Sequence, residues 1–356
     1  MVADGNPSAF WALSQLALQA GIEPLEVSLT ATSRLVNLFH GGISADPEKA
    51  ARYTADSEAA RVGTKARLYA KLSFLEFQTR LRQAEGFEPT NNRWNIIQEH
   101  ALLGSSIRAL RNRGISSQRL IVPDVYPKES GILAAQAHEG TTIAVWNQTA
   151  FAELQERGIA SELIKPFLLD GLLPFETDFA DQGKEIVVKS SGSGMPAAWS
   201  DALRASLHGL NGDWAMHTPG SVVTEVGSTS IAKRKDQIQE FYNNLGGRTR
   251  LLIGYPSELV EVMCELRARS VPVWMITLPP RGSHEKRNLQ FALENDIVLG
   301  ELRFKGDEKE SSLPGLRQID LNNISKLVSW GQPDFLTVPL GTTSVWEDKQ
   351  LTQQAA

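Results

Sequence analysis

The chain has 356 residues, of which 42% are hydrophobic and 22% charged, with a formal net charge of -5. Its length predicts two globular domains, and its acidic balance argues against nucleic acid as a partner, because such binding needs basic surface. A single cysteine excludes an internal disulfide framework and favours the cytoplasm, and no apolar run reaches the ~20 residues of a membrane-spanning helix.

Short apolar strands alternate with helical patterns along most of the chain, which is typical of parallel α/β layers. In the first half we predict helices at residues 8–18, 46–84, 95–113, 129–137 and 149–156, and strands at 25–29, 119–122, 142–145 and 162–167. A Gly-, Pro- and acid-rich segment, 168–182, interrupts this rhythm. We therefore predict one domain over residues 1–170 and a second over 171–356.

The alternation restarts in the second half. The predicted strands are 185–188, 214–217, 249–253, 271–278 and 297–299, and the predicted helices are 196–207, 233–244, 257–268 and 284–294. A polar tail follows from about residue 342.

The first candidate site is a small-residue loop between a strand and a helix, with the sequence KSSGSGMP over residues 189–196. The first turn of a helix has unpaired amides at the positive end of its dipole, and glycines allow an anion to approach them closely. A tight turn that needs glycine only for its backbone angles explains the same residues equally well.

The second candidate site is the start of the helix that follows the strand 249–253. Glu258, Glu261 and Glu265 are spaced by three and four residues and lie near one helical face. A carboxylate in this position can accept hydrogen bonds from both hydroxyls of a ribose. A solvated acidic face at a helix N-terminus is the alternative interpretation.

A third candidate site follows the strand 271–278. His284, Glu285 and Asn288 begin a helix there, at the carboxyl end of a strand, where ligands bind in open α/β sheets. They could hold sugar hydroxyls, although Ser283 as an N-cap with ordinary polar neighbours is also an adequate explanation.

In this order, the three segments resemble the donor-binding half of GT-B glycosyltransferases that use UDP-sugars, in particular the monogalactosyldiacylglycerol synthase and lipid II N-acetylglucosaminyltransferase group. The resemblance covers about residues 118–300 and implies two Rossmann-like domains whose parallel sheets face an interdomain cleft. It implies that the diphosphate binds at Ser191, Gly192, Ser193, Gly194 and Met195. It assigns the ribose to Glu261, with Tyr255, Ser257 and Glu258 beside it, and the sugar to His284, Glu285 and Asn288.

The first half resembles the acceptor domain more loosely. Asp124, at the end of a strand, is the candidate general base, and His138, His217 and His284 are the alternatives. The acceptor-side loop comprises Gly5, Asn6 and Ser8. The family has a longer first strand and a histidine where Asn6 stands, which predicts either a shortened start or a different acid–base arrangement.

The resemblance implies inverting transfer of a sugar from a UDP-sugar to a hydroxyl of a lipid or glycan, with no metal and no cofactor besides this co-substrate. A nucleotide-sugar epimerase and a degenerate, non-catalytic binding protein are the alternatives. The basic amphipathic segment 61–82 would either touch a membrane surface from the cytoplasmic side or pack its apolar stripe into the first domain.

Overall fold

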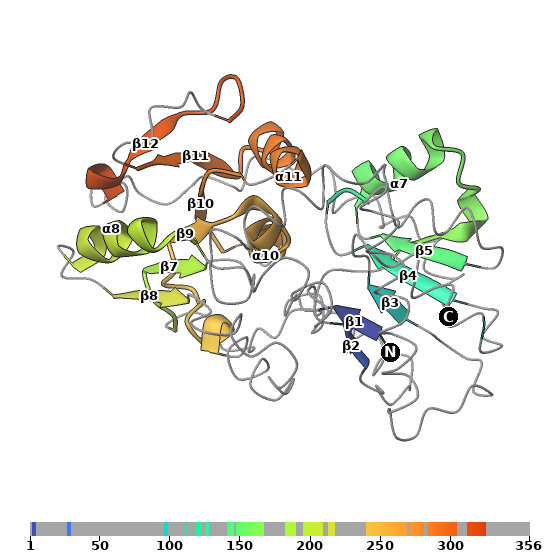
Figure 1. The fold of residues 1–356 in the computed structure, drawn as a ribbon, viewed down its shortest axis with the longest axis horizontal. Helices are drawn as coiled ribbons and strands as arrows, with labels where there is room; N and C mark the ends of the chain where they lie inside the picture. Colours follow the sequence, from blue (N-terminus) through green and yellow to red (C-terminus); the bar gives the residue numbers. More distant parts are fainter. Residues whose placement is uncertain are drawn as a thin grey trace, which may run out of the picture.

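In the computed structural model, the described residues form two six-stranded sheets, and every pairing between neighbouring strands among them is parallel (Figure 1). The residues that it describes are 2–4, 27–29, 96–98, 112, 118–122, 125–127, 141–145, 147–166, 182–189, 195–208, 213–217, 240–268, 271–280, 283–304 and 312–324. The protein is thus α/β, as the alternation of strands and helices predicts.

The first sheet has the strand order β2-β1-β3-β4-β5-β6. Its strands are β1 (Val2–Asp4), β2 (Val27–Leu29), β3 (Ile96–Gln98), β4 (Gln118–Val122), β5 (Thr141–Val145) and β6 (Ile164–Pro166). Between β5 and β6 lie helix α7 (Gln148–Glu156) and the 3-10 turn η2 (Ser161–Leu163).

The second sheet has the order β12-β11-β10-β9-β7-β8. Its strands are β7 (Ile186–Lys189), β8 (Trp214–His217), β9 (Leu251–Gly254), β10 (Trp274–Thr277), β11 (Val298–Arg303) and β12 (Gln318–Asp320). The helices with described bounds in this half are α8 (Ala197–His208), α10 (Pro256–Ala268), α11 (Ser283–Glu294) and the 3-10 turn η3 (Leu321–Asn323).

Both sheets repeat one topology. In each, the first strand lies inside the sheet with the second strand on one side and the third on the other, so the winding direction reverses between the first and third strands. Ligands of open parallel sheets bind at such switch points, beyond the carboxyl ends of the strands. In the second sheet the switch point lies between β7 and β9.

The second sheet is buried on both faces, which accounts for its nearly continuous apolar strands. Val187 and Leu252 pack in the cluster that contains α10 and α11, whereas Val188 and Ile253 pack in the cluster that contains α8. Successive side chains of a strand point to opposite faces. The sheet is therefore the middle layer of three, with α8 on one side and α10 and α11 on the other (Figure 1).

Local signals in the sequence account for the ends of α7. The side chain of Asn147 caps the N-terminus by accepting a hydrogen bond from the Ala150 amide at 2.8 Å. At the other end, Gly158 has a φ of 81°, which glycine adopts without strain, and the Ile159 amide donates to the Leu154 carbonyl at 3.0 Å.

Most of the predicted elements between residues 118 and 303 are confirmed to within a few residues. One prediction is wrong: Ile96–Gln98 is a strand rather than the start of a helix, because it pairs in parallel with β1 and β4. The short first strand, β1, pairs with β2 and β3 and was not among the predicted elements. The strand β12 was not predicted.

Several other predictions lie outside the described residues: the helices 8–18, 46–84 and 129–137, the basic segment 61–82, the tail, and the boundary near residue 170. The domain division therefore stays a prediction. Within the described parts of the chain, no helix is both long and apolar enough to cross a bilayer.

Candidate functional site

The candidate site lies at the carboxyl edge of the second sheet, on the face covered by α10 and α11. Lys189 ends β7 and Gly254 ends the neighbouring β9, so these two residues flank the switch point. A Cβ added at Gly254 would lie 2.5 Å from the Lys189 carbonyl oxygen and 2.9 Å from Leu259 Cδ1 of α10. Only glycine allows the two strands and the helix to approach this closely.

A buried ion pair lies across this switch point. Lys189 Nζ is 3.3 Å from Glu258 Oε2, and the side chains of the two residues are 11% and 10% exposed. The ammonium also lies 4.6 Å from the centre of the Phe241 ring. Glu258 is in the first turn of α10, where the helix dipole favours a carboxylate. A positive charge is thus fixed at the end of β7.

His217, at the end of β8, extends this row of polar side chains. Asn244 Nδ2 lies 3.2 Å from His217 Nε2, and the imidazole packs edge-on against Phe241 at 5.5 Å between ring centres. Burial lowers the pKa of His217, nearby Lys189 lowers it further, and Glu240 raises it. The ring is therefore neutral at pH 7, since even the usual imidazole pKa is about 6.5.

A second polar group joins the N-termini of α10 and α11. Ser257 Oγ donates to Glu285 Oε1 at 3.2 Å, and Glu285 is 1% exposed. Asn288, one turn further along α11, is 2% exposed, and its Oδ1 accepts no hydrogen bond from the described residues. A buried amide oxygen without a donor is costly, so this group can accept a hydroxyl or a water.

The structure brings together four of the predicted donor-site residues, namely Ser257, Glu258, Glu285 and Asn288, at the start of two adjacent helices. Met195 and Tyr255 are 5% and 1% exposed and pack in the apolar cluster on the α8 face. Their side chains therefore belong to the core on that face. Glu261 and Glu265 lie on α10 and His284 on α11, but their side chains are outside the description.

The remaining candidates lie outside the described residues. They are Ser191, Gly192, Ser193, Gly194, Asp124, His138, Gly5, Asn6 and Ser8. Among the residues that the structure does describe, no three or more His, Cys, Asp or Glu side chains are grouped so that they could hold a metal ion.

Lys189 is the residue that the sequence reasoning missed. A lysine that ends an apolar strand and directly precedes a run of serines and glycines was available as a signal. Its importance depends on Glu258, which is far away in the sequence and meets Lys189 only through the parallel pairing of β7 with β9.

A groove of about 740 Å³ separates α7 from α11 next to this site. Arg287 of α11 forms an ion pair with Glu153 of α7, and its guanidinium stacks 4.1 Å from the centre of the Tyr126 ring, which follows β4. Burial raises the pKa of Tyr126, as do Glu294 and Glu153, whereas Arg287 lowers it. Arg287 thus connects the helix that carries Glu285 to the first sheet's half of the chain.

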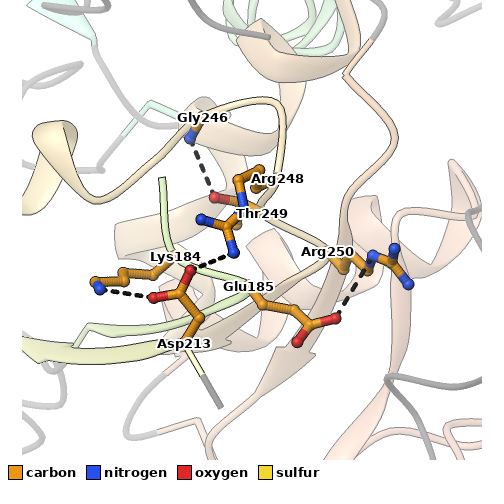
Figure 2. A network of polar contacts seen from close by, with 7 residues as sticks. All are labelled: Lys184, Glu185, Asp213, Gly246, Arg248, Thr249 and Arg250. Atoms are coloured by element: carbon orange, nitrogen blue, oxygen red, sulfur yellow. Dashed lines mark hydrogen bonds and ion pairs between the residues drawn. The ribbon is translucent and has the colours of Figure 1, made fainter. Parts of the chain in front are cut away.

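The opposite, amino edge of the second sheet carries a separate polar cluster, which Figure 2 shows. Asp213 accepts from Lys184 and from Arg248, both at 2.6 Å, and Glu185 lies 3.6 Å from Arg250. The hydrogen bond from Lys184 is the main cause of a lowered pKa at Asp213. These residues precede the strands β7, β8 and β9, on the edge where ligands do not bind in such sheets.

Comparison with protein-family models finds no match, and comparison with curated proteins finds none either. Among solved structures, the chain is similar to the crystal structure of MurG from Acinetobacter baumannii, with 12% identity and a TM-score of 0.39 over 92% of this chain and 87% of that one. It is also similar to the apo form of the lipopolysaccharide outer core galactosyltransferase WaaB, with 10% identity and a TM-score of 0.24 over 82% and 73%. Likeness at this level does not establish a shared activity.

Proposed function

We propose that the protein is a GT-B glycosyltransferase that moves a sugar from a UDP-sugar to a hydroxyl of a lipid or glycan. One observation carries the proposal. The switch point lies between β7, which the glycine-rich segment follows in the sequence, and β9, which the acidic helix α10 follows. That is the position at which parallel α/β sheets bind nucleotides.

In this proposal the donor spans the starts of three helices. The amides of Ser191–Gly194, before α8, hold the diphosphate at the positive end of that helix. A carboxylate of α10 holds the ribose; Glu261 is the first candidate, and Glu258 and Glu265 are the others. Glu285, Asn288 and His284 on α11 face the sugar, and the buried oxygens of Glu285 and Asn288 suit hydroxyl donors.

The reaction is a single displacement. The acceptor oxygen attacks the anomeric carbon while the bond from that carbon to the diphosphate oxygen breaks, which inverts the configuration. UDP leaves with the electron pair, and the acceptor proton passes to a base, for which Asp124 is the candidate. Amides and a helix dipole fixed at the leaving diphosphate lower the barrier, because they are already oriented before the charge develops.

Calorimetric titration of the purified chain with UDP tests the proposal. UDP binds the wild type, and Glu261→Ala weakens it by about 1–3 kcal/mol through loss of the ribose hydrogen bonds. Glu185→Ala, on the opposite edge of the sheet, is the matched control and leaves the affinity unchanged. If Glu261→Ala also leaves it unchanged, the ribose role passes to Glu258 or Glu265.

A thermal-shift screen over nucleotides and nucleotide-sugars identifies the donor, because a ligand that binds only the folded chain raises its melting temperature. The absence of any shift would refute the proposal. Product analysis separates transfer from epimerisation: the transferase needs an acceptor and forms a glycoside, whereas an epimerase releases UDP and an altered free sugar without one.

A further inference from the structure

We propose that Lys189 is a diphosphate-binding residue, which places a positive charge against the leaving group of the donor. The inference rests on the proposed function and adds to it a residue that binds through its side chain rather than through loop amides. Glu258 acts as the positioning residue that holds the ammonium in place.

The position of Lys189 is the first argument. It is the last residue of β7, at the switch point, and the segment Ser190–Gly194 follows it directly in the chain. Along β7 the side chains alternate, and Lys189 shares the face of Val187, which is the face covered by α10. Its ammonium therefore lies between the end of β7 and the first turn of α10, as the contact with Glu258 shows.

The surroundings of the ammonium are the second argument. Lys189 is 9% exposed and lies between a carboxylate at 3.3 Å and an aromatic ring at 4.6 Å. Removing two charges from water costs about as much as their attraction returns, so a buried pair of this kind contributes little to stability. A contribution to stability therefore does not account for the pair, which lies at the edge where parallel sheets bind ligands.

The chemistry of the side chain is the third argument. An ammonium has three donors, so a lysine can contact a carboxylate and phosphate oxygens at the same time. When the bond to the anomeric carbon breaks, the diphosphate gains negative charge, and a fixed cation stabilises it.

The test measures the binding of UDP, uridine and inorganic diphosphate by calorimetry in the wild type and in Lys189→Met. We expect Lys189→Met to weaken UDP and inorganic diphosphate about tenfold to hundredfold, the usual range for losing a hydrogen bond to a charged group. Uridine has no phosphate, so its affinity changes less than about twofold. Lys184→Met is the matched control, since Lys184 precedes the same strand at its other end and pairs with Asp213.

Lys189→Met alone leaves Glu258 without its ion-pair partner and can fail to fold. A second comparison, between the wild type and Lys189→Met/Glu258→Gln, removes this difficulty because the double variant contains neither of the two buried charges. The ratio of UDP affinity to uridine affinity falls about tenfold or more from the wild type to the double variant if Lys189 binds the diphosphate.

The outcomes separate the two proposals. If UDP binds the wild type and its preference over uridine is the same without Lys189, the inference is overturned and the proposed function stands. If inorganic diphosphate binds through Lys189 but neither UDP nor uridine binds, the phosphate site stands and the proposed function is refuted. If the wild type binds none of the three, both are refuted.

Discussion

The close contact at Gly254 predicts a large effect from a single added methyl group. In Gly254→Ala, the new Cβ would lie 2.5 Å from the Lys189 carbonyl oxygen, about 0.8 Å short of the ~3.3 Å at which carbon and carbonyl oxygen ordinarily touch. Leu259, whose Cδ1 would lie at 2.9 Å, is fully buried in the core. Either β9 separates from β7 or α10 shifts outward.

Overpacking of this kind costs about 1–3 kcal/mol, and we expect the upper end because backbone lies on one side and core on the other. A domain of this size then loses roughly 6–12 °C of melting temperature, at about 2–4 °C for each kcal/mol. Thermal and urea unfolding of the variant measure both quantities.

Gly158→Ala provides the control for this prediction. Gly158 has a φ of 81° but no atom within 4 Å of the added Cβ, so its cost is backbone strain alone, about 1–2 kcal/mol. Replacement by asparagine, which tolerates this region, recovers part of that cost at Gly158 but none of it at Gly254. A Gly254→Ala variant as stable as Gly158→Ala would refute the argument from close approach.

Three further changes have effects of known sign. Because burial lowers the pKa of His217, the unfolded chain takes up the proton at a higher pH than the folded chain, so the stability of the wild type falls as the pH drops below about 6.5. In His217→Gln, the free energy of unfolding depends less on pH, as measured by urea unfolding between pH 5 and 8. The hydrogen bond from Lys184 is the main cause of the lowered pKa of Asp213, so this pairing stabilises the folded chain above about pH 3.9, and that stabilisation is lost as the pH falls further. In Asp213→Asn, the stability therefore depends less on pH in the acid range, as measured by acid unfolding followed by circular dichroism. The partly exposed pair of Arg287 with Glu153 gives a coupling free energy of up to about 1 kcal/mol in a double-mutant cycle of Arg287→Gln and Glu153→Gln.

Each of these has a result that would contradict it. An unchanged slope in His217→Gln would mean that the imidazole titrates alike in the folded and unfolded chains. An Asp213→Asn variant with the acid sensitivity of the wild type would assign acid unfolding to other carboxylates. Strict additivity in the third case would mean that Arg287 and Glu153 do not interact in solution.

The sequence predicts the second sheet well because its signals are local. Strands β7, β9 and β10 are short apolar runs, and each is followed in the sequence by glycine, proline or serine residues and then by a helix. Both faces of these strands are covered, so apolar runs appear without alternation, as expected for a parallel sheet. The same reasoning predicts that Glu258 and Glu285 begin helices at the carboxyl edge of the sheet, where the structure has them.

Local signals fail where strand pairing decides the structure. Ile96–Gln98 reads as the start of a helix, because a short apolar run shows the same pattern in either state. Its pairing between β1 and β4 makes it a strand, and that pairing depends on residues far away in the sequence. The strand β12, three residues long, gains its identity in the same way from β11.

Lys184, which precedes β7, and Lys189, which ends β7, show what the topology of the sheet adds to the amino-acid composition. Lys184 and Lys189 are the same residue type five positions apart, and each pairs with an acid. At the amino edge, Lys184 is 42% exposed and its partner Asp213 precedes the adjacent strand, so the pair is a solvated contact worth about 1 kcal/mol or less. At the carboxyl edge, the Lys189 side chain is 11% exposed and its partner begins the helix beyond the switch point. Nothing in the residues themselves distinguishes the two positions; the direction of the strand does, because only one edge of a parallel sheet has helix N-termini and a switch point that can receive an anion.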